Sequence, residues 1–169
     1  MLPIGRLLVV GLTPPATSGA RTRARVNTAR QLLGFATVDL VNLFAFTTHD
    51  ATDLSVAGQQ SDGWHAARPV LGAGLENADG VLLAYGVQLP TGLARTHFRS
   101  QVDWLERRLV EVDLPVWLVG GAPRHPSRWQ RYTHRTAPEL PFEQALHLAL
   151  RLREATPAPA PAQETHVPT

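Results

Sequence analysis

Residues 9–30, VVGLTPPATSGARTRARVNTAR, decide the fold class of this 169-residue chain. They join the end of an apolar run, a loop of proline, threonine, serine and glycine, and an arginine-rich segment. The arginine-rich segment begins a predicted helix that continues beyond Arg30. One face of this helix carries the apolar residues Val26, Ala29, Leu33 and Ala36. A buried strand followed by a loop and an amphipathic helix is typical of the first unit of an α/β domain.

Four short apolar runs predict the strands of this domain, at residues 7–11, 38–43, 81–84 and 116–119. They lack polar alternation, which is typical of parallel strands covered on both faces. Helical patterns separate them, at 62–78 and 98–112 among others, and a last helix begins near Pro141. We therefore expect one three-layer α/β/α domain over residues 1–155, with a central, mostly parallel four-stranded sheet.

Composition excludes several classes of protein. The chain has no cysteine, which excludes disulfides, thiolate zinc sites and thiol catalysis. No apolar stretch reaches the roughly 18 residues that a membrane span needs. The apolar run among the first residues is too short for a signal peptide. We expect a cytoplasmic protein without a membrane partner, and a disordered Pro/Ala-rich tail at residues 156–169.

Ligands of a parallel α/β sheet bind beyond the carboxyl ends of its strands. This rule selects residues 13–17, 42–53, 85–90 and 120–134. The first segment has the order of a phosphate-binding P-loop, but the chain has no lysine, and two adjacent prolines remove N–H donors. These features argue against a nucleoside triphosphatase, although the helix that follows still favours an anion at its first turn.

The second segment offers groups that suit a nucleobase. Asn42 ends a predicted strand, where its amide can donate and accept hydrogen bonds at a base edge; a structural role in the loop is the alternative. Phe44 has the ring to stack on a base, and core packing is its alternative role. His49, Asp50 and Asp53 lack a partner cluster of definite spacing, so no metal is predicted.

Two arginine clusters contain no acidic residue. The stretch GGAPRHPSRWQRYTHR carries arginines at spacings of four, three and four, which share one face if the segment is helical. Trp129 and Tyr132 lie between them, and such a surface suits phosphates and bases together. The alternative is a surface helix that packs through Trp129. The clusters are Arg21, Arg23, Arg25 and Arg30, and Arg124, Arg128, Arg131 and Arg135.

Several segments resemble the domain-of-unknown-function family numbered 1643. They are GLTPPAT, RVNTARQLLGFA, LVNLFAF, SDGWH, GVLLAYG and GAPRHPSRW, and they follow one another in the order seen in that family. The resemblance covers residues 7–135 and implies no settled activity.

The layout is also similar, more remotely, to the uracil-DNA glycosylase superfamily. Those enzymes have a G-x-(N/D)-P loop after the first strand, an asparagine that reads the base, a WG pair and an HPS loop after the last strand. The matching positions are residues 11–14, Asn42, 84–86 and 125–127. The resemblance implies that His125 donates to the base in catalysis. It also implies a set of substrate-binding residues, namely Pro14, Asn42, Phe44, Tyr85, Gly86 and Ser127.

The chain departs from both families at Thr13, where they have Asn or Asp before the proline. In glycosylases that residue orients or activates water. The threonine hydroxyl can hold water but is a poor base, and Asp62, within SDGWH, is the other candidate for water activation.

The sequence thus predicts a uracil-DNA-glycosylase-like protein without a cofactor. It recognises a nucleobase in DNA and, where the site is catalytic, hydrolyses its N-glycosidic bond. The alternatives are a non-catalytic nucleic-acid or nucleotide binder and a hydrolase of a free nucleoside-like molecule. The predicted nucleic-acid contacts are Arg21, Arg25, Arg124, Arg128 and Arg131.

Overall fold

The computed structural model describes residues 2–154, which fold around a five-stranded sheet. Its strands are β1 (Arg6–Gly11), β2 (Thr37–Asn42), β3 (Gly80–Leu83), β4 (Val116–Val119) and β5 (Leu150–Leu152). The order is β2-β1-β3-β4-β5; the first four are parallel, and β5 runs antiparallel to β4. The α/β class is confirmed, but the predicted number of four strands is wrong. The fifth strand, LRL, follows a helix directly and is too short to show a period-two pattern.

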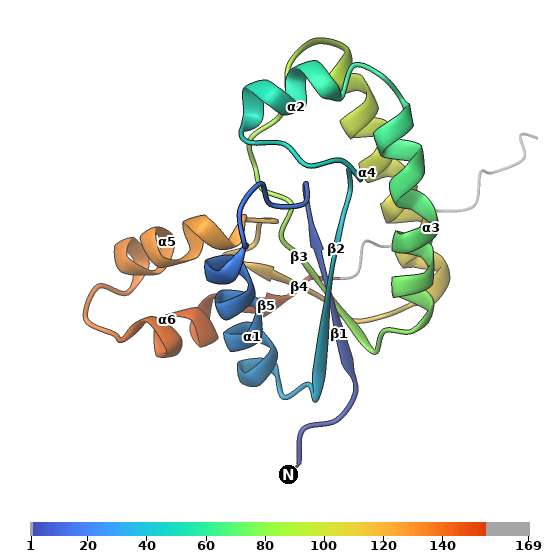
Figure 1. Cartoon of the computed structure of the whole chain (residues 1–169). Helices are drawn as coiled ribbons and strands as arrows, with labels where there is room; N and C mark the ends of the chain where they lie inside the picture. Colours follow the sequence, from blue (N-terminus) through green and yellow to red (C-terminus); the bar gives the residue numbers. More distant parts are fainter. Residues whose placement is uncertain (1, 155–169) are drawn as a thin grey trace, which may run out of the picture.

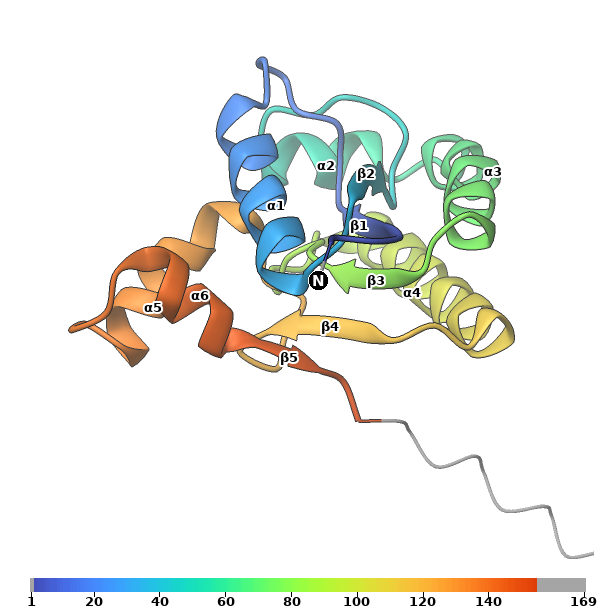
Figure 2. The ribbon, with the colours of Figure 1, turned by 90° about the horizontal axis from the view of Figure 1, so that it is seen from below.

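The sheet is covered on both faces because alternate residues of its central strands point to opposite sides. Leu8 and Val10 of β1 pack into one apolar cluster, and Leu7 and Val9 pack into another. On the first face lie α3 (Asp62–Glu76) and α4 (Gly92–Val112), and on the second lie α1 (Ala20–Leu33) and α6 (Phe142–Ala149), with α5 (Trp129–Thr136) beside α6 (Figures 1 and 2).

The first helix has the predicted buried stripe in part, because Leu33 is half-buried and Ala36 is exposed beyond the end of the helix. Val26 and Ala29 of α1 are buried against the sheet. The helix is bounded by Gly19 and Gly34, both in the left-handed region with φ of 66° and 79°. The N–H of Gly34 donates to the last helical carbonyls, as glycine commonly does where a helix ends. Gly19 thus sets where α1 begins and Gly34 sets where it ends. These limits determine which side chains of α1 face the sheet.

A short helix, α2 (Ala51–Ala57), was not predicted from the sequence. Its N-cap is Asp50, whose side chain accepts from the Asp53 N–H at 2.9 Å. The Asp53 carboxylate in turn accepts from the His49 N–H at 3.0 Å. The two acids therefore satisfy N–H groups at the start of this helix, which is a common use of aspartate.

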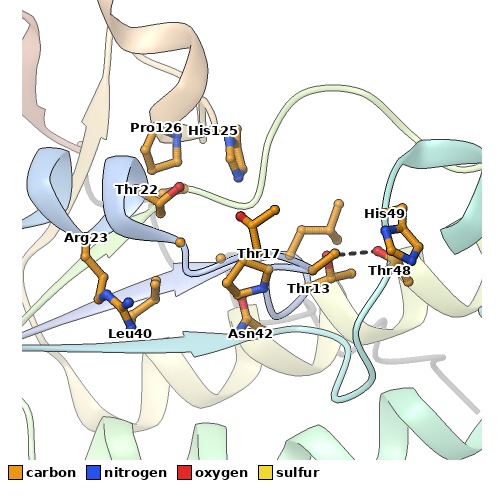
Figure 3. Close-up of a pocket in the computed structure, with 16 residues that line it drawn as sticks. Thr13, Thr17, Thr22, Arg23, Leu40, Asn42, Thr48, His49, His125 and Pro126 are labelled. Atoms are coloured by element: carbon orange, nitrogen blue, oxygen red, sulfur yellow. Dashed lines mark hydrogen bonds between the residues drawn. The ribbon is translucent and has the colours of Figure 1, made fainter.

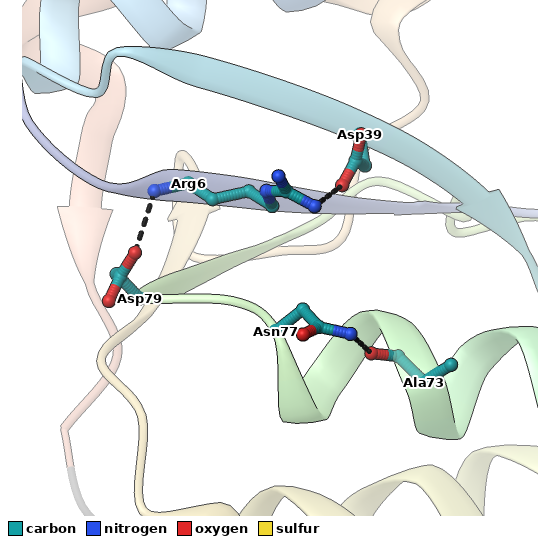
Figure 4. A network of polar contacts seen from close by, with 5 residues as sticks. All are labelled: Arg6, Asp39, Ala73, Asn77 and Asp79. Carbon is teal, nitrogen blue, oxygen red and sulfur yellow. Dashed lines mark hydrogen bonds and ion pairs between the residues drawn. The ribbon is translucent and has the colours of Figure 1, made fainter.

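A network of hydrogen bonds and an ion pair holds the amino-terminal ends of the strands (Figure 4). Asp79 accepts from the Arg6 N–H at 2.8 Å, and the Arg6 guanidinium lies 3.2 Å from Asp39. Asn77 donates to the Ala73 carbonyl at the end of α3. These contacts join β1 to β2 and to the α3–β3 turn, so polar groups here serve the fold. Within residues 2–154, no helix is both long enough and apolar enough to cross a bilayer. The predicted disordered tail lies outside these residues.

Candidate functional site

Two adjoining pockets open at the carboxyl edge of the sheet. The first, which we call the inner pocket, has a volume of about 550 Å³ (Figure 3). The second, which we call the arginine groove, has a volume of about 870 Å³. The two pockets share Leu12, Thr13, Thr48, His49 and His125. All four segments selected from the sequence contribute residues to them.

Asn42 lies in the inner pocket at the end of β2, beside Gly11 of β1. A Cβ atom on Gly11 would lie only 2.6 Å from the Asn42 Oδ1 atom, so the lack of a side chain at Gly11 makes room for this amide. Within residues 2–154, the Asn42 side chain makes no hydrogen bond that would occupy it. Because Asn42 lines the inner pocket, its amide is available to a ligand there.

His125 is oriented by its own turn. It precedes a short 3₁₀ helix, η1 (Pro126–Arg128), and the Ser127 N–H donates to His125 Nδ1 at 3.1 Å. The Ser127 hydroxyl lies 2.8 Å from the same nitrogen. Because a backbone N–H can only donate, Nδ1 is an acceptor and the proton of the neutral ring is on Nε2. His125 therefore offers an N–H donor to the pocket, into which it points (Figure 3).

The surroundings keep this imidazole neutral. Burial lowers the pKa of His125, and the positive charges of Arg128 and Arg25 lower it further. Both effects disfavour the imidazolium form. At neutral pH the ring is therefore a neutral donor rather than a cation.

Thr13 also lines both pockets, and its hydroxyl is 3.0 Å from that of the buried Thr48 (Figure 3). The pair places two hydroxyls at the border between the two pockets. Among the described residues, 2–154, no carboxylate lines the inner pocket. Asp62 is exposed in the first turn of α3 and lines neither pocket, so the structure does not bring this predicted catalytic acid to the site.

Phe44 does not line either pocket, and its predicted stacking on a base is wrong. Its side chain has no exposed surface and packs against Trp64 with ring centroids 4.9 Å apart. The ring also fills the space beside Gly63, where a Cβ atom would lie 2.2 Å away. The alternative role, core packing, is the one observed.

The arginine groove collects one of the two arginine clusters. Arg124, Arg128, Arg131 and Arg135 all line it, although they do not lie on one helix: Arg124 precedes η1, Arg128 ends it, and only Arg131 and Arg135 lie in α5. The Arg124 guanidinium lies 4.1 Å from the centre of the Tyr132 ring, and its buried Nε makes no hydrogen bond within residues 2–154. Asp50 is the acidic residue of the groove lining, and its carboxylate caps α2. Trp129, meanwhile, is fully buried, so this helix packs through Trp129 and presents arginines to the groove.

The other predicted residues divide into two groups. Tyr85, Gly86 and Ser127 line the groove, whereas Pro14 and Arg21 line neither pocket. Tyr85 is 8% exposed, and burial, with a smaller effect of Glu106 opposed by Arg153, raises its pKa to about 12.

Arg25 has a different role from the predicted nucleic-acid contact. Its guanidinium donates to the Pro126 carbonyl at 2.9 Å and to Gln130 at 3.2 Å. It therefore fastens α1 to the turn that carries His125.

Sequence reasoning missed several residues that line the inner pocket. Thr17, Thr22, Arg23 and Thr48 contribute polar groups, and His49 lies at its border with the groove. One signal was present: Thr22 and Arg23 precede Val26 by four and three residues, which continues the buried face of α1.

Within residues 2–154, no group of three His, Asp or Glu side chains could hold a metal ion. No protein-family model matches the chain, and neither the curated proteins nor the solved structures give a significant match.

Proposed function

We propose that the inner pocket binds a nucleobase of a DNA strand and that His125 promotes hydrolysis of its N-glycosidic bond, as in uracil-DNA-glycosylase-like proteins. One observation carries the proposal: the fixed Nε2–H of His125 and the unoccupied amide of Asn42 line one pocket. A donor on one side and a donor–acceptor pair on the other match the oxygen and nitrogen atoms of a base edge. The remote resemblance to the uracil-DNA glycosylase superfamily is in line with this proposal.

The chemistry follows from the charge that develops as the bond breaks. The electrons of the C1′–N bond leave with the base, which becomes an anion, while the sugar becomes a cation. Neutral His125 donates to a base oxygen, and the positive charges of Arg128 and Arg25 also favour that anion. Water held at Thr13 then adds to C1′, its proton passes to solvent, and the base is protonated. Removing one such donor raises the barrier by about 2.7–4 kcal/mol.

The arginine groove supports a strand rather than an isolated base. It adjoins the inner pocket and is lined by four arginines. A duplex substrate requires the nucleotide to leave the stack, at an expense of a few kcal/mol. Contacts from Arg124, Arg128 and Arg131 to phosphates offset this expense. Such contacts release counterions, so affinity falls with salt.

A second candidate function is base recognition without turnover. It is favoured by the inner pocket lining, in which residues 2–154 supply no carboxylate to act as a base toward water or to stabilise the sugar cation. Both candidates predict base-dependent binding, and only the first predicts an abasic product. Hydrolysis of a free nucleoside-like molecule, the third class, predicts binding without the salt dependence.

The decisive experiment uses oligonucleotides that carry uracil, hydroxymethylated or deaminated bases, with abasic-site formation as the readout. His125→Ala is expected to lower excision by about 100- to 1,000-fold with little change in DNA affinity. Arg128→Ala is expected to weaken affinity and its salt dependence while the bound substrate still reacts. If both variants bind and react like the wild type, the site lies elsewhere. If the wild type binds in a base-dependent manner without product, the second candidate holds.

A further inference from the structure

We infer that the inner pocket accepts a nucleobase that carries a hydroxylated substituent, with Thr22 and Arg23 as the subsite for that substituent. The inference rests on the proposed function and extends it to a class of base. Its first support is size, since the pocket volume of about 550 Å³ lies within the range of roughly 300–1,000 Å³ that holds drug-sized ligands. An unsubstituted pyrimidine is much smaller than such ligands.

The pocket extends in a definite direction from the predicted base position. Figure 3 shows His125 on one side of the pocket and Asn42 on the opposite side, with Thr17 between them. Thr13, Thr48 and His49 lie to one side of Thr17, and Thr22 and Arg23 lie to the other. A base held between His125 and Asn42 therefore leaves the α1 end of the pocket to another group.

The lining of this end combines the apolar Leu40 and Pro126 with polar groups that can select a substituent. Within residues 2–154, the hydroxyls of Thr17 and Thr22 make no hydrogen bond. Arg23 donates through Nη2 to the Ser18 carbonyl, which holds the guanidinium in place and leaves other N–H groups free. An aliphatic substituent would remove water from these groups without replacing its hydrogen bonds, and each unmet buried group costs about 1–3 kcal/mol. Hydroxyl groups would pair with them.

The positions of Thr22 and Arg23 on α1 distinguish them from the neighbouring Arg21. Val26 and Ala29 are buried against the sheet, and Thr22 and Arg23 lie one turn earlier on the same face. Arg21 and Arg23 are both exposed, but Arg23 lines the inner pocket and Arg21 lines neither pocket. Arg21 is thus a matched control, because it carries the same charge on the same turn.

The test compares four single-stranded oligonucleotides that differ at one position. The position holds uracil, 5-hydroxymethyluracil, glucosylated 5-hydroxymethyluracil or an abasic analogue, and the sugar is 2′-fluorinated so that cleavage does not intervene. Affinity is measured by fluorescence anisotropy at one salt concentration. The wild type is expected to bind the glucosylated base on the order of tenfold more tightly than uracil, as one or two added hydrogen bonds allow.

Variants then locate the preference. Thr22→Val and Arg23→Gln are expected to remove most of the ratio between the affinities for the glucosylated base and for uracil. Thr22→Ser and Arg21→Gln are expected to retain this ratio, and Arg21→Gln shows how far the loss of one charge lowers the affinity for every strand. Circular dichroism checks that each variant is folded. A preference that survives both Thr22→Val and Arg23→Gln overturns the subsite.

The remaining outcomes separate this inference from the proposed function. If uracil and both substituted bases bind equally, and all more tightly than the abasic strand, the inference is overturned while base recognition stands. If the abasic strand binds as well as the other three, base recognition fails, and the inference fails with it.

Discussion

The imidazole of His125 is held from two directions. The Ser127 N–H fixes Nδ1 as an acceptor from within the turn, and Arg25 reaches from α1 to the Pro126 carbonyl. Residues 25 and 126 are far apart in sequence, so this contact makes the position of the turn depend on α1. Arg25 also acts at a distance, because its charge contributes to the lowered pKa of His125.

The Arg25→Gln variant tests that electrostatic effect. Removing the cation is expected to raise the pKa of His125 toward its ordinary value, but only in part, because burial and Arg128 remain. A histidine whose folded pKa is lowered binds fewer protons than in the unfolded chain, so it destabilises the fold as pH falls below the unfolded pKa. Arg25→Gln should therefore reduce the loss of stability that His125 causes at low pH. NMR titration of the ring measures the pKa, Arg21→Gln is the control, and an unchanged pKa would contradict the assignment.

Gly11→Ala tests the position of the Asn42 amide. The new Cβ atom would meet Oδ1 at 2.6 Å, and the amide, as the end of a flexible side chain, is expected to rotate away. Base affinity should then fall on the order of tenfold, as for a lost pair of hydrogen bonds, while unfolding free energy changes by less than about 1 kcal/mol. Gly72→Ala in α3 is the control, since its Cβ atom meets nothing closer than 3.9 Å. A Gly11→Ala protein with wild-type base affinity would show that Asn42 does not read the base.

Among the elements, α4 supports the ligand edge through Gln101. This side chain is fully buried, and its Nε2 donates to the carbonyls of Leu43 at 2.8 Å and Trp64 at 2.7 Å. Its Oε1 accepts from Arg68 Nε at 2.9 Å. One amide thereby joins α3, α4 and the loop that leaves β2 toward Thr48.

Gln101→Leu is expected to destabilise the protein strongly. It leaves the Leu43 carbonyl and the Arg68 Nε without a partner, and the Trp64 carbonyl with only its helical hydrogen bond, so we expect the unfolding free energy to fall by about 2–4 kcal/mol. Equilibrium denaturation in urea measures the change. Gln31→Leu, on the exposed face of α1, is the control and should stay within about 0.5 kcal/mol of the wild type. A loss below about 1 kcal/mol would show that water replaces the amide.

Elements with local signals could be predicted, and elements that depend on tertiary contacts could not. The stripe of Val26 and Ala29 identified α1, and the four apolar runs identified β1 to β4. The three residues of β5 become a strand because α6 delivers them to the free edge of β4. The only sequence signal of α2 was the pair Asp50 and Asp53, which also suits a metal site.

The same limit applied to the site. The loops at the carboxyl edge followed from topology, so Thr13, Asn42 and His125 were expected together and do line one pocket. Which side chain of a loop faces inward depends on packing from other elements. Trp64 and Gly63 of α3 draw Phe44 into the core, and the turn at Pro126 takes Arg25 as a partner while Arg23 lines the pocket.

Across the whole molecule, positive charge is concentrated at the arginine groove, although the formal net charge is only +2. Three arginines outside the groove form ion pairs with acids: Arg6 with Asp39, Arg108 with Glu76 and Glu111, and Arg153 with Glu106. Within residues 2–154, none of the four groove arginines forms an ion pair with a carboxylate. Their charge is therefore available to a polyanion at the mouth of the inner pocket.

The salt dependence of DNA binding tests this arrangement. If Arg128, Arg131 and Arg135 each neutralise one phosphate of a single strand, replacing any one by alanine should lower the slope of log affinity against log salt by about 0.7. Arg107→Ala is the matched control, because Arg107 is exposed on α4 and lines neither pocket. The slope is measured by anisotropy over a salt series with one oligonucleotide. Equal slopes for all four variants and the wild type would place the strand on another surface, since the groove would then release no counterions.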